Sequence, residues 1–116
     1  MATGTINAGY KDITDQFVWD STVQQKQALQ IGNLIIVRFQ ASRTGSKNAW
    51  IYATIPASLG IVDGRWTGIA IAANAAYYIR IYGTQPNQDL RTESFASSIS
   101  WIQGQIELVR NAPAIA

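Results

Sequence analysis

Three places in the sequence put a tryptophan next to side chains that can hold a ligand by fixed hydrogen bonds. They read SRTGSKNAW (42–50), VDGRW (62–66) and QFVWDS (16–21). An aromatic ring supplies an apolar face, and carboxylate, amide and guanidinium groups supply donors and acceptors at set positions. Ligands with C–H faces and hydroxyl edges, such as sugars, need both kinds of group. The pattern therefore indicates candidate binding residues at these places.

The first two places supply six candidate residues, and the third, with Trp19 beside Asp20, carries less weight. The six are Arg43, Asn48, Trp50, Asp63, Arg65 and Trp66. We expect Gly64 to form a turn, and we expect both segments to be loops that converge at one end of the molecule, because loops carry function more often than strands do. The competing interpretation places these tryptophans in the core or at a subunit contact, where aromatic residues commonly lie. That structural interpretation is favoured for Trp101.

The residue inventory argues against catalysis. The chain has no histidine and no cysteine, which removes the commonest general base, the commonest zinc ligand and any disulfide. None of the seven acidic residues is marked out as half of a carboxylate pair, as glycoside hydrolysis would require. Asp12, Asp15 and Asp20 lack the spacing of a calcium loop and are interpreted as turn-capping residues. We expect no enzyme activity, no metal and no cofactor.

Charge and hydropathy argue against two further classes of protein, those that bind nucleic acids and those that cross a membrane by a helix. The nine basic residues are scattered along the chain, whereas a nucleic-acid-binding protein concentrates them in a stripe. The longest suitable uncharged apolar run, 66–79, is shorter than the roughly 18 residues of a membrane helix, and the N-terminus has no apolar signal region. Charged residues make up 14% of the chain against a typical value of about 25%. This deficit is typical of extracellular and virion β-proteins.

Period-two alternation predicts strands over most of the chain. KQALQI (26–31) and LIIVRFQA (34–41) flank Gly32-Asn33, which favours a hairpin with Ile35, Val37 and Phe39 on one face. AWIYATIP (49–56) alternates with its isoleucines on one side and Trp50 and Tyr52 on the other. Two strands, 66–73 and 76–83, are expected around a turn at Asn74.

The remaining segments complete an all-β chain. The strand SISWIQGQIELV (98–109) is expected to turn Ile102, Ile106 and Leu108 inward, with Gly104 at a bulge or a close approach. Residues 84–97 form a polar loop with a short strand. Helical periodicity is absent. We predict one domain over 1–116, an antiparallel β-sandwich or jelly roll of seven or eight strands, with 1–9 as a linker and 111–116 as a tail.

The order of the segments resembles the C-terminal head domains of bacteriophage receptor-binding proteins, the tail-fibre and baseplate tips of phages of Gram-positive bacteria. The resemblance runs from about Gln27 to Val109 and rests on the GNLIIV strand, the IYATIP strand that ends in proline, and the closing SWIQGQIE strand. It implies a homotrimeric head of a virion protein that hangs from an upstream tail or baseplate protein. It also implies adhesion to host cell-wall polysaccharide or teichoic acid.

Two alternatives stay open. One is a trimeric spacer or decoration module of a virion, in which every tryptophan is buried. The other, less favoured, is a fragment of a polysaccharide-degrading enzyme. Neither the sugar nor the host follows from the sequence, and a site within one protomer is as compatible with it as a site between two.

Overall fold

The computed structural model describes residues 10–42, 50–72, 75–83, 87–92 and 100–110; for residues 61–67, 72 and 75 it describes the backbone alone. The predicted linker and tail lie outside this part of the chain. The described elements are β1 (Lys11–Asp12), the 3-10 helix η2 (Thr14–Gln16), β2 (Val18–Trp19), β3 (Val23–Ile31), β4 (Leu34–Ser42), β5 (Trp50–Ile55), the 3-10 helix η3 (Ala57–Leu59), β6 (Ile61–Ala72), β7 (Ala75–Tyr82), β8 (Gln88–Thr92) and β9 (Trp101–Arg110). No described helix is long and apolar enough to cross a membrane.

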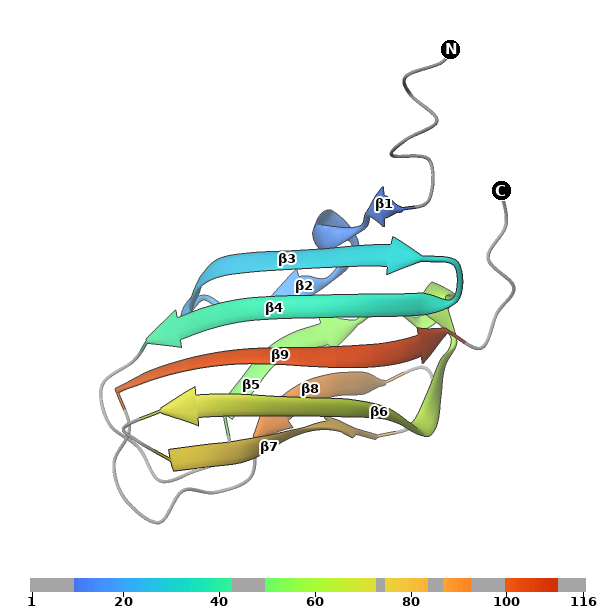
Figure 1. Cartoon of the computed structure of the whole chain (residues 1–116). Coiled ribbons are helices and arrows are strands. Elements are labelled where there is room, and N and C mark those ends of the chain that lie inside the picture. Colours follow the sequence, from blue (N-terminus) through green and yellow to red (C-terminus); the bar gives the residue numbers. More distant parts are fainter. Residues whose placement is uncertain (1–9, 43–49, 73–74, 84–86, 93–99, 111–116) are drawn as a thin grey trace.

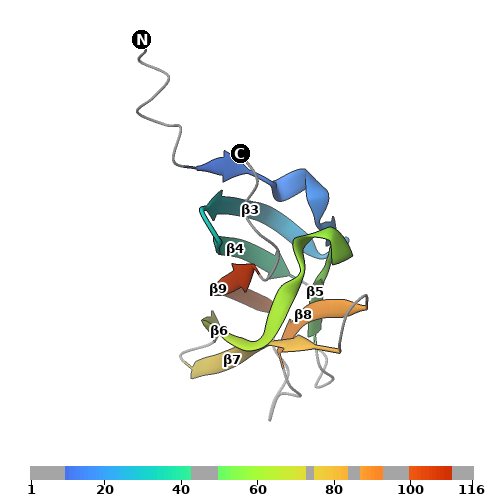
Figure 2. The same ribbon diagram turned by 90° about the vertical axis from the view of Figure 1, so that its right-hand side faces the viewer.

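The strands form one antiparallel sheet of nine strands that curls on itself, in the order β1-β3-β4-β9-β6-β7-β8-β5-β2. Strand β7 pairs with β6 along one edge and with β8 along the other, so it carries the sheet from one layer into the next. β3, β4, β9 and β6 form the front layer in Figure 1, and β5 and β8 lie behind them, as the turned view in Figure 2 shows. The predicted all-β, antiparallel, sandwich-like fold is confirmed.

The segment Lys11–Trp19, here called the N-terminal strap, connects the two ends of the sheet. Its first strand pairs with β3 and its second with β5, so a single short segment touches both edges. The backbone N–H of Ile13 donates to the carbonyl of Ala28 at 2.8 Å. Ile13 and Phe17 are buried in the core. The strap thereby covers part of each edge, where unpaired backbone groups would otherwise invite pairing with another chain.

Strands β4 and β9 lie side by side at the middle of the front layer, and both follow the predicted alternation. Ile35, Val37 and Phe39 of β4 are buried, as are Ile102, Ile106 and Leu108 of β9. Their intervening side chains face outward. The hairpin between β3 and β4 is also confirmed, and Gly32 has a φ of 58°, which suits a primed turn.

In strand β5, the side chains do not alternate between the two faces as predicted. Trp50 and Tyr52 point into the core and Ile51 is exposed, but Ala53 and Ile55, which follow, are also buried. The pairing with β8 shifts register between Ile51 and Ala53. An extra residue in one strand moves every later side chain to the opposite face, so two inward residues follow each other at the shift.

The backbone of residues 62–66 also differs from its prediction. The sequence predicts a turn at Gly64, whereas the backbone continues as strand from Ile61 to Ala72. Its pairing with β9 shifts register between Ile61 and Trp66, which accounts for the glycine without a loop. The predicted antiparallel pairing of the next two strands is confirmed as β6 and β7, although 73–74 lie outside the described residues. The short strand predicted within 84–97 is β8.

Gly104 of β9 marks a close approach rather than a bulge. The pairing of β9 with both neighbours runs through it without a shift. A Cβ at this position would lie 2.6 Å from Ile79 Cδ1 and 2.7 Å from Phe39 Cζ. The absence of a side chain therefore lets Phe39 and a residue of β7 pack directly against the β9 backbone.

Candidate functional site

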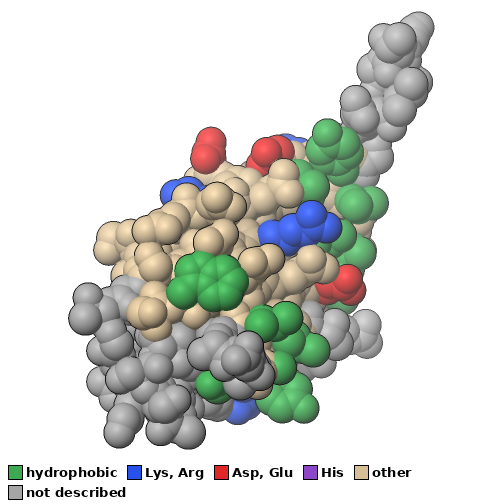
Figure 3. All heavy atoms as spheres, turned by 60° about the vertical axis from the view of Figure 1, so that its left-hand side comes forward, with side chains coloured by type: hydrophobic (Ala, Val, Ile, Leu, Met, Phe, Trp, Pro, Cys, Tyr) green, Lys and Arg blue, Asp and Glu red, His purple; other side chains and the backbone are tan. Residues whose placement is uncertain are grey.

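The outward face of the front layer is hollowed along β3, β4, β9 and β6. The hollow, here called the glutamine groove, has a volume of about 510 Å³. Figure 3 brings this side of the molecule forward and shows mainly uncharged polar side chains and backbone, with separate clusters of hydrophobic side chains. The groove is lined by Gln25, Lys26, Gln27, Arg38, Phe39, Gln40, Ile69, Ile71, Trp101, Gln103, Gly104 and Gln105.

Strand register arranges the outward side chains of the groove in rows across the sheet. One row runs Gln27, Arg38, Gln105, Ile69, and the next runs Gln25, Gln40, Gln103, Ile71. Neighbouring members of a row stand about 4.8 Å apart, the distance between paired strands. Each row therefore offers polar groups at β3, β4 and β9 and an apolar side chain at β6.

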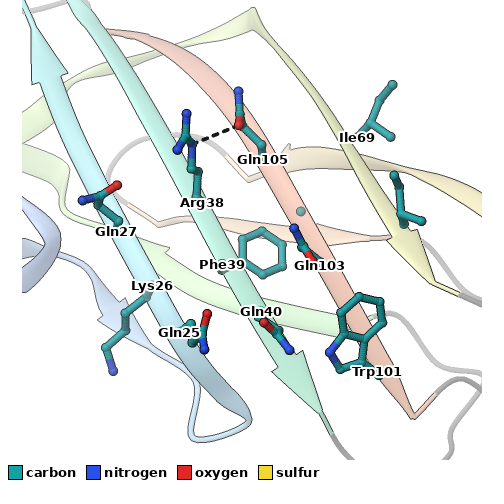
Figure 4. Close-up of a pocket in the computed structure, with 12 residues that line it drawn as sticks. Gln25, Lys26, Gln27, Arg38, Phe39, Gln40, Ile69, Trp101, Gln103 and Gln105 are labelled. Atoms are coloured by element: carbon teal, nitrogen blue, oxygen red, sulfur yellow. Dashed lines mark hydrogen bonds between the residues drawn. The ribbon is translucent and has the colours of Figure 1, made fainter.

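The amide groups of the groove are largely uncommitted. Arg38 Nε donates to Gln105 Oε1 at 3.1 Å, the contact drawn in Figure 4. Within the described part of the chain, the amides of Gln25, Gln27, Gln40 and Gln103 take part in no hydrogen bond. Each amide carries two donors and an acceptor. The groove can therefore donate to and accept from several hydroxyl groups at once.

Trp101 provides an aromatic ring at one end of the groove. It pairs with Ser42 at the start of β9, and it keeps 38% of its surface exposed. On β6, Ile69 and Ile71 are more than half exposed. Figure 4 shows Trp101 and Ile69 to one side of the polar side chains from β3 and β4. The groove thus combines an apolar side with a hydrogen-bonding side.

Packed aromatic rings support the floor of the groove. The Phe39 ring lies between β4 and β9 (Figure 4), in the space that the missing side chain of Gly104 leaves. Below it, the Phe39 and Tyr52 ring centroids are 4.2 Å apart, and Tyr52 is fully buried. The Tyr52 hydroxyl shares a 2.8 Å hydrogen bond with Thr92 Oγ1. The layer behind therefore supports the groove through packed rings.

The predicted candidate Trp50 lies in the core and not in a ligand site. Its side chain is fully buried, its Nε1 donates to Thr22 Oγ1 at 3.0 Å, and its ring centroid is 5.6 Å from that of Tyr52. A sugar platform needs an exposed ring face, which this ring does not present. The prediction of Trp50 as a ligand contact is therefore corrected, because this side of β5, shared with Tyr52, faces the core.

The remaining predicted candidates stay predictions. The side chains of Asp63, Arg65 and Trp66 lie outside the described part of the structure, and so do Arg43 and Asn48. On the backbone, Trp66 pairs with Leu108, whereas Ser42, the first residue of the other segment, pairs with Trp101 at the opposite end of β9. The expected convergence of the two segments stays a prediction, because residues 43–49 lie outside the described part of the structure.

The third place, around Trp19, forms a structural corner. Trp19 Nε1 donates to the carbonyl oxygen of Thr14 at 2.9 Å, and the ring packs on Phe17. Asp20 accepts hydrogen bonds from the backbone N–H and the hydroxyl of Thr22. A small hollow of about 180 Å³ lies beside Trp19 and Asp20. The interpretation of this aspartate as a turn-capping residue is confirmed.

Asp12 caps a turn in the same way. It accepts hydrogen bonds from the Thr14 hydroxyl at 2.6 Å and from the Thr14 backbone N–H at 2.9 Å. These bonds, that of the hydroxyl above all, hold the pKa of the Asp12 carboxyl below its ordinary value of 3.8. Within the described residues, no group of three or more acidic side chains is placed to hold a metal ion.

Strand β7 carries a row of alternate residues, Tyr78, Arg80 and Tyr82. Tyr78 and Arg80 are exposed while Ile79 and Ile81 are buried, so the row faces outward. The Arg80 guanidinium carbon lies 5.2 Å from the centre of the Tyr82 ring, and that of Arg91 lies 4.4 Å from it. Arg91 of β8 therefore stacks on the Tyr82 ring across strands, and Arg80 contacts the same ring from within β7.

The residues that sequence reasoning missed are Trp101 and the glutamines. The alternation of β9 could have identified these residues. It places Ile102 inside, and therefore Trp101, Gln103 and Gln105 outside. The general tendency of tryptophan to be buried outweighed that alternation. The pairing of these residues with Gln25, Gln27 and Gln40 depends on strand order, which no local pattern gives.

Comparison of the chain with protein-family models, with curated proteins and with solved structures finds no match.

Proposed function

We propose that this protein is a non-catalytic adhesion module that holds a saccharide in the glutamine groove. The observation that carries the proposal is the position of an exposed tryptophan, Trp101, in the same hollow as four glutamine amides without hydrogen-bond partners among the described residues. Sugars stack their C–H faces on aromatic rings and share hydrogen bonds with amides. The groove offers both on a rigid sheet, which favours recognition without loop rearrangement.

The biological setting that we propose is the tip of a bacteriophage tail, with host cell-wall polysaccharide or teichoic acid as the partner. Support comes from the segment order of the sequence, from the low content of charged residues, and from the β-sandwich-like fold. The rival function, a structural spacer with all tryptophans buried, is supported by Trp50. Trp101 is the residue that favours adhesion over the spacer.

The proposal is tested with Trp101→Ala and a matched control, Tyr10→Ala, which removes an exposed aromatic ring outside the groove. Labelled protein is titrated onto Gram-positive cells, with and without stripping of the wall polysaccharide. We expect strain-restricted binding that stripping abolishes and that Trp101→Ala weakens by about tenfold or more, since a single aromatic contact can carry a large share of the binding energy. Tyr10→Ala should bind like the unchanged protein.

Two results would contradict the proposal. A folded protein that binds no strain in a broad panel would favour the spacer. Equal binding by the two variants would remove the groove as the site. In that case Asp63→Ala and Trp66→Ala, at the other end of β6, test the site that the sequence indicates.

A further inference from the structure

The charged residues described in the lining of the glutamine groove are all basic. None of the described residues that line it is acidic, and Arg38 stands in the middle of it, in a row between Gln27 and Gln105. Lys26 also belongs to the lining, but Figure 4 shows its side chain pointing away from the other groove residues. The nearest acid along β9 is Glu107, which pairs with Ile36 one row further along and lies outside the lining. Among the described lining residues, Arg38 is therefore the cation that faces the interior of the groove.

Arg38 is exposed and has no carboxylate partner in the described part of the chain. Its Nε donates to the Gln105 side chain, and its terminal nitrogens have no acceptor among the described residues. Arg91, by contrast, forms a two-point ion pair with Asp89, at 2.9 and 3.0 Å. The Gln105 amide fixes the plane of the Arg38 guanidinium and leaves its fork of donors available. Such a fork matches the two oxygens of a carboxylate or a phosphate.

The rows of the groove also bear on the shape of the ligand. Polar groups recur at about 4.8 Å on β3, β4 and β9, a spacing close to the length of one sugar ring in a chain. A chain laid across the strands meets one amide or guanidinium group per strand and then the apolar side chains of β6.

We propose that the groove binds a stretch of a linear, acidic glycan, and that Arg38 is the residue that selects for its anionic groups. The inference rests on the proposed saccharide-binding function and adds the class of saccharide. The shared chemistry is a planar or tetrahedral oxyanion, a uronic carboxylate or a phosphodiester, on a polyhydroxylated chain. A neutral glycan lacks the group that completes the donor fork of Arg38.

The test compares Arg38→Gln with Lys11→Gln, which removes the same charge from an exposed position on β1 outside the groove. The probes are the wall glycans of a strain that the protein binds, separated by anion exchange into a neutral and an acidic fraction. We expect the acidic fraction to bind at least tenfold more tightly than the neutral one. Arg38→Gln should remove about that factor, as expected for loss of a charge-assisted pair, and Lys11→Gln should change affinity less than twofold.

Further experiments distinguish uronates from phosphodiesters as the source of the negative charge. They also distinguish the acidic-glycan inference from the proposal of saccharide adhesion. Carboxyl reduction of the acidic fraction should abolish the preference if uronates carry it, and mild hydrofluoric acid should do so if phosphodiesters carry it. Equal binding of both fractions, or equal losses in Arg38→Gln and Lys11→Gln, would overturn the acidic-glycan inference and leave saccharide adhesion standing, provided that Trp101→Ala still weakens binding. Failure of every fraction to bind would overturn both.

Discussion

At the scale of single residues, Gly104 is the position on which both the core and the groove depend. A methyl group there would meet Ile79 and Phe39 at distances that require these side chains to move. We expect Gly104→Ala to lower the free energy of unfolding by about 1–3 kcal/mol, the usual effect of overpacking a closed core. Denaturant unfolding followed by tryptophan fluorescence measures it.

The neighbouring residue provides the control for this prediction. Gln103→Ala changes an exposed side chain of the same strand and should alter stability by no more than about 0.5 kcal/mol. If the two variants are equally stable, the Phe39 ring does not fill the space over Gly104 as tightly as the 2.7 Å approach indicates.

Single residues also show where sequence reasoning stops. Gly104 was predicted as a bulge or a close approach, and the close approach is confirmed. Trp50 and Trp101 exchanged their expected environments, because residue type favours burial of both while the strand alternation decides which one faces out. The register shift in β5 then changes faces at a point that the local pattern does not mark. Six residues were taken as candidates, and the one whose side chain the structure describes, Trp50, lies in the core.

At the scale of elements, the N-terminal strap is the segment whose loss affects both layers. Phe17 is buried between its two short strands, next to Trp19. We expect Phe17→Ala to cost about 3–5 kcal/mol of stability and to increase aggregation, because a loosened strap uncovers the edges of β3 and β5. Denaturant unfolding and static light scattering at rising temperature measure the two effects.

The adjacent residue of the strap is the matched control. Val18 is largely exposed, so Val18→Ala removes an apolar side chain from the same element without opening the core. A large loss of stability in Val18→Ala, or unchanged aggregation in Phe17→Ala, would show that the strap does not protect the edges. Regular elements such as β4 followed from the sequence, whereas the strap did not, because strands of two residues carry no periodicity.

At the scale of the whole molecule, the class of fold was predictable and the strand order was not. Alternation and turn residues are local, so they identify strands and hairpins such as β3 with β4. The pairing of β9 between β4 and β6, and of β8 between β7 and β5, joins segments far apart in the sequence. The glutamine groove exists only because of this order. It brings Gln25, Gln40 and Gln103 into one row.

The last prediction concerns the predicted homotrimer. If the groove is to stay accessible, the subunit interface cannot cover it. Ile71 is a large exposed apolar residue of β6 and also lines the groove. We expect light scattering to give the mass of three 12.7 kDa chains, and we expect Ile71→Ser to keep that mass while it weakens glycan binding. The reason is that an interface over β6 would close the groove.

A mass of one chain for the unchanged protein would contradict the predicted trimer and leave the groove accessible. A trimer that Ile71→Ser converts into monomers would be more damaging. Exposed apolar residues often mark subunit contacts, and dissociation would show that this face is covered in the assembly. The groove would then be unavailable to a glycan, and adhesion would have to reside at another surface.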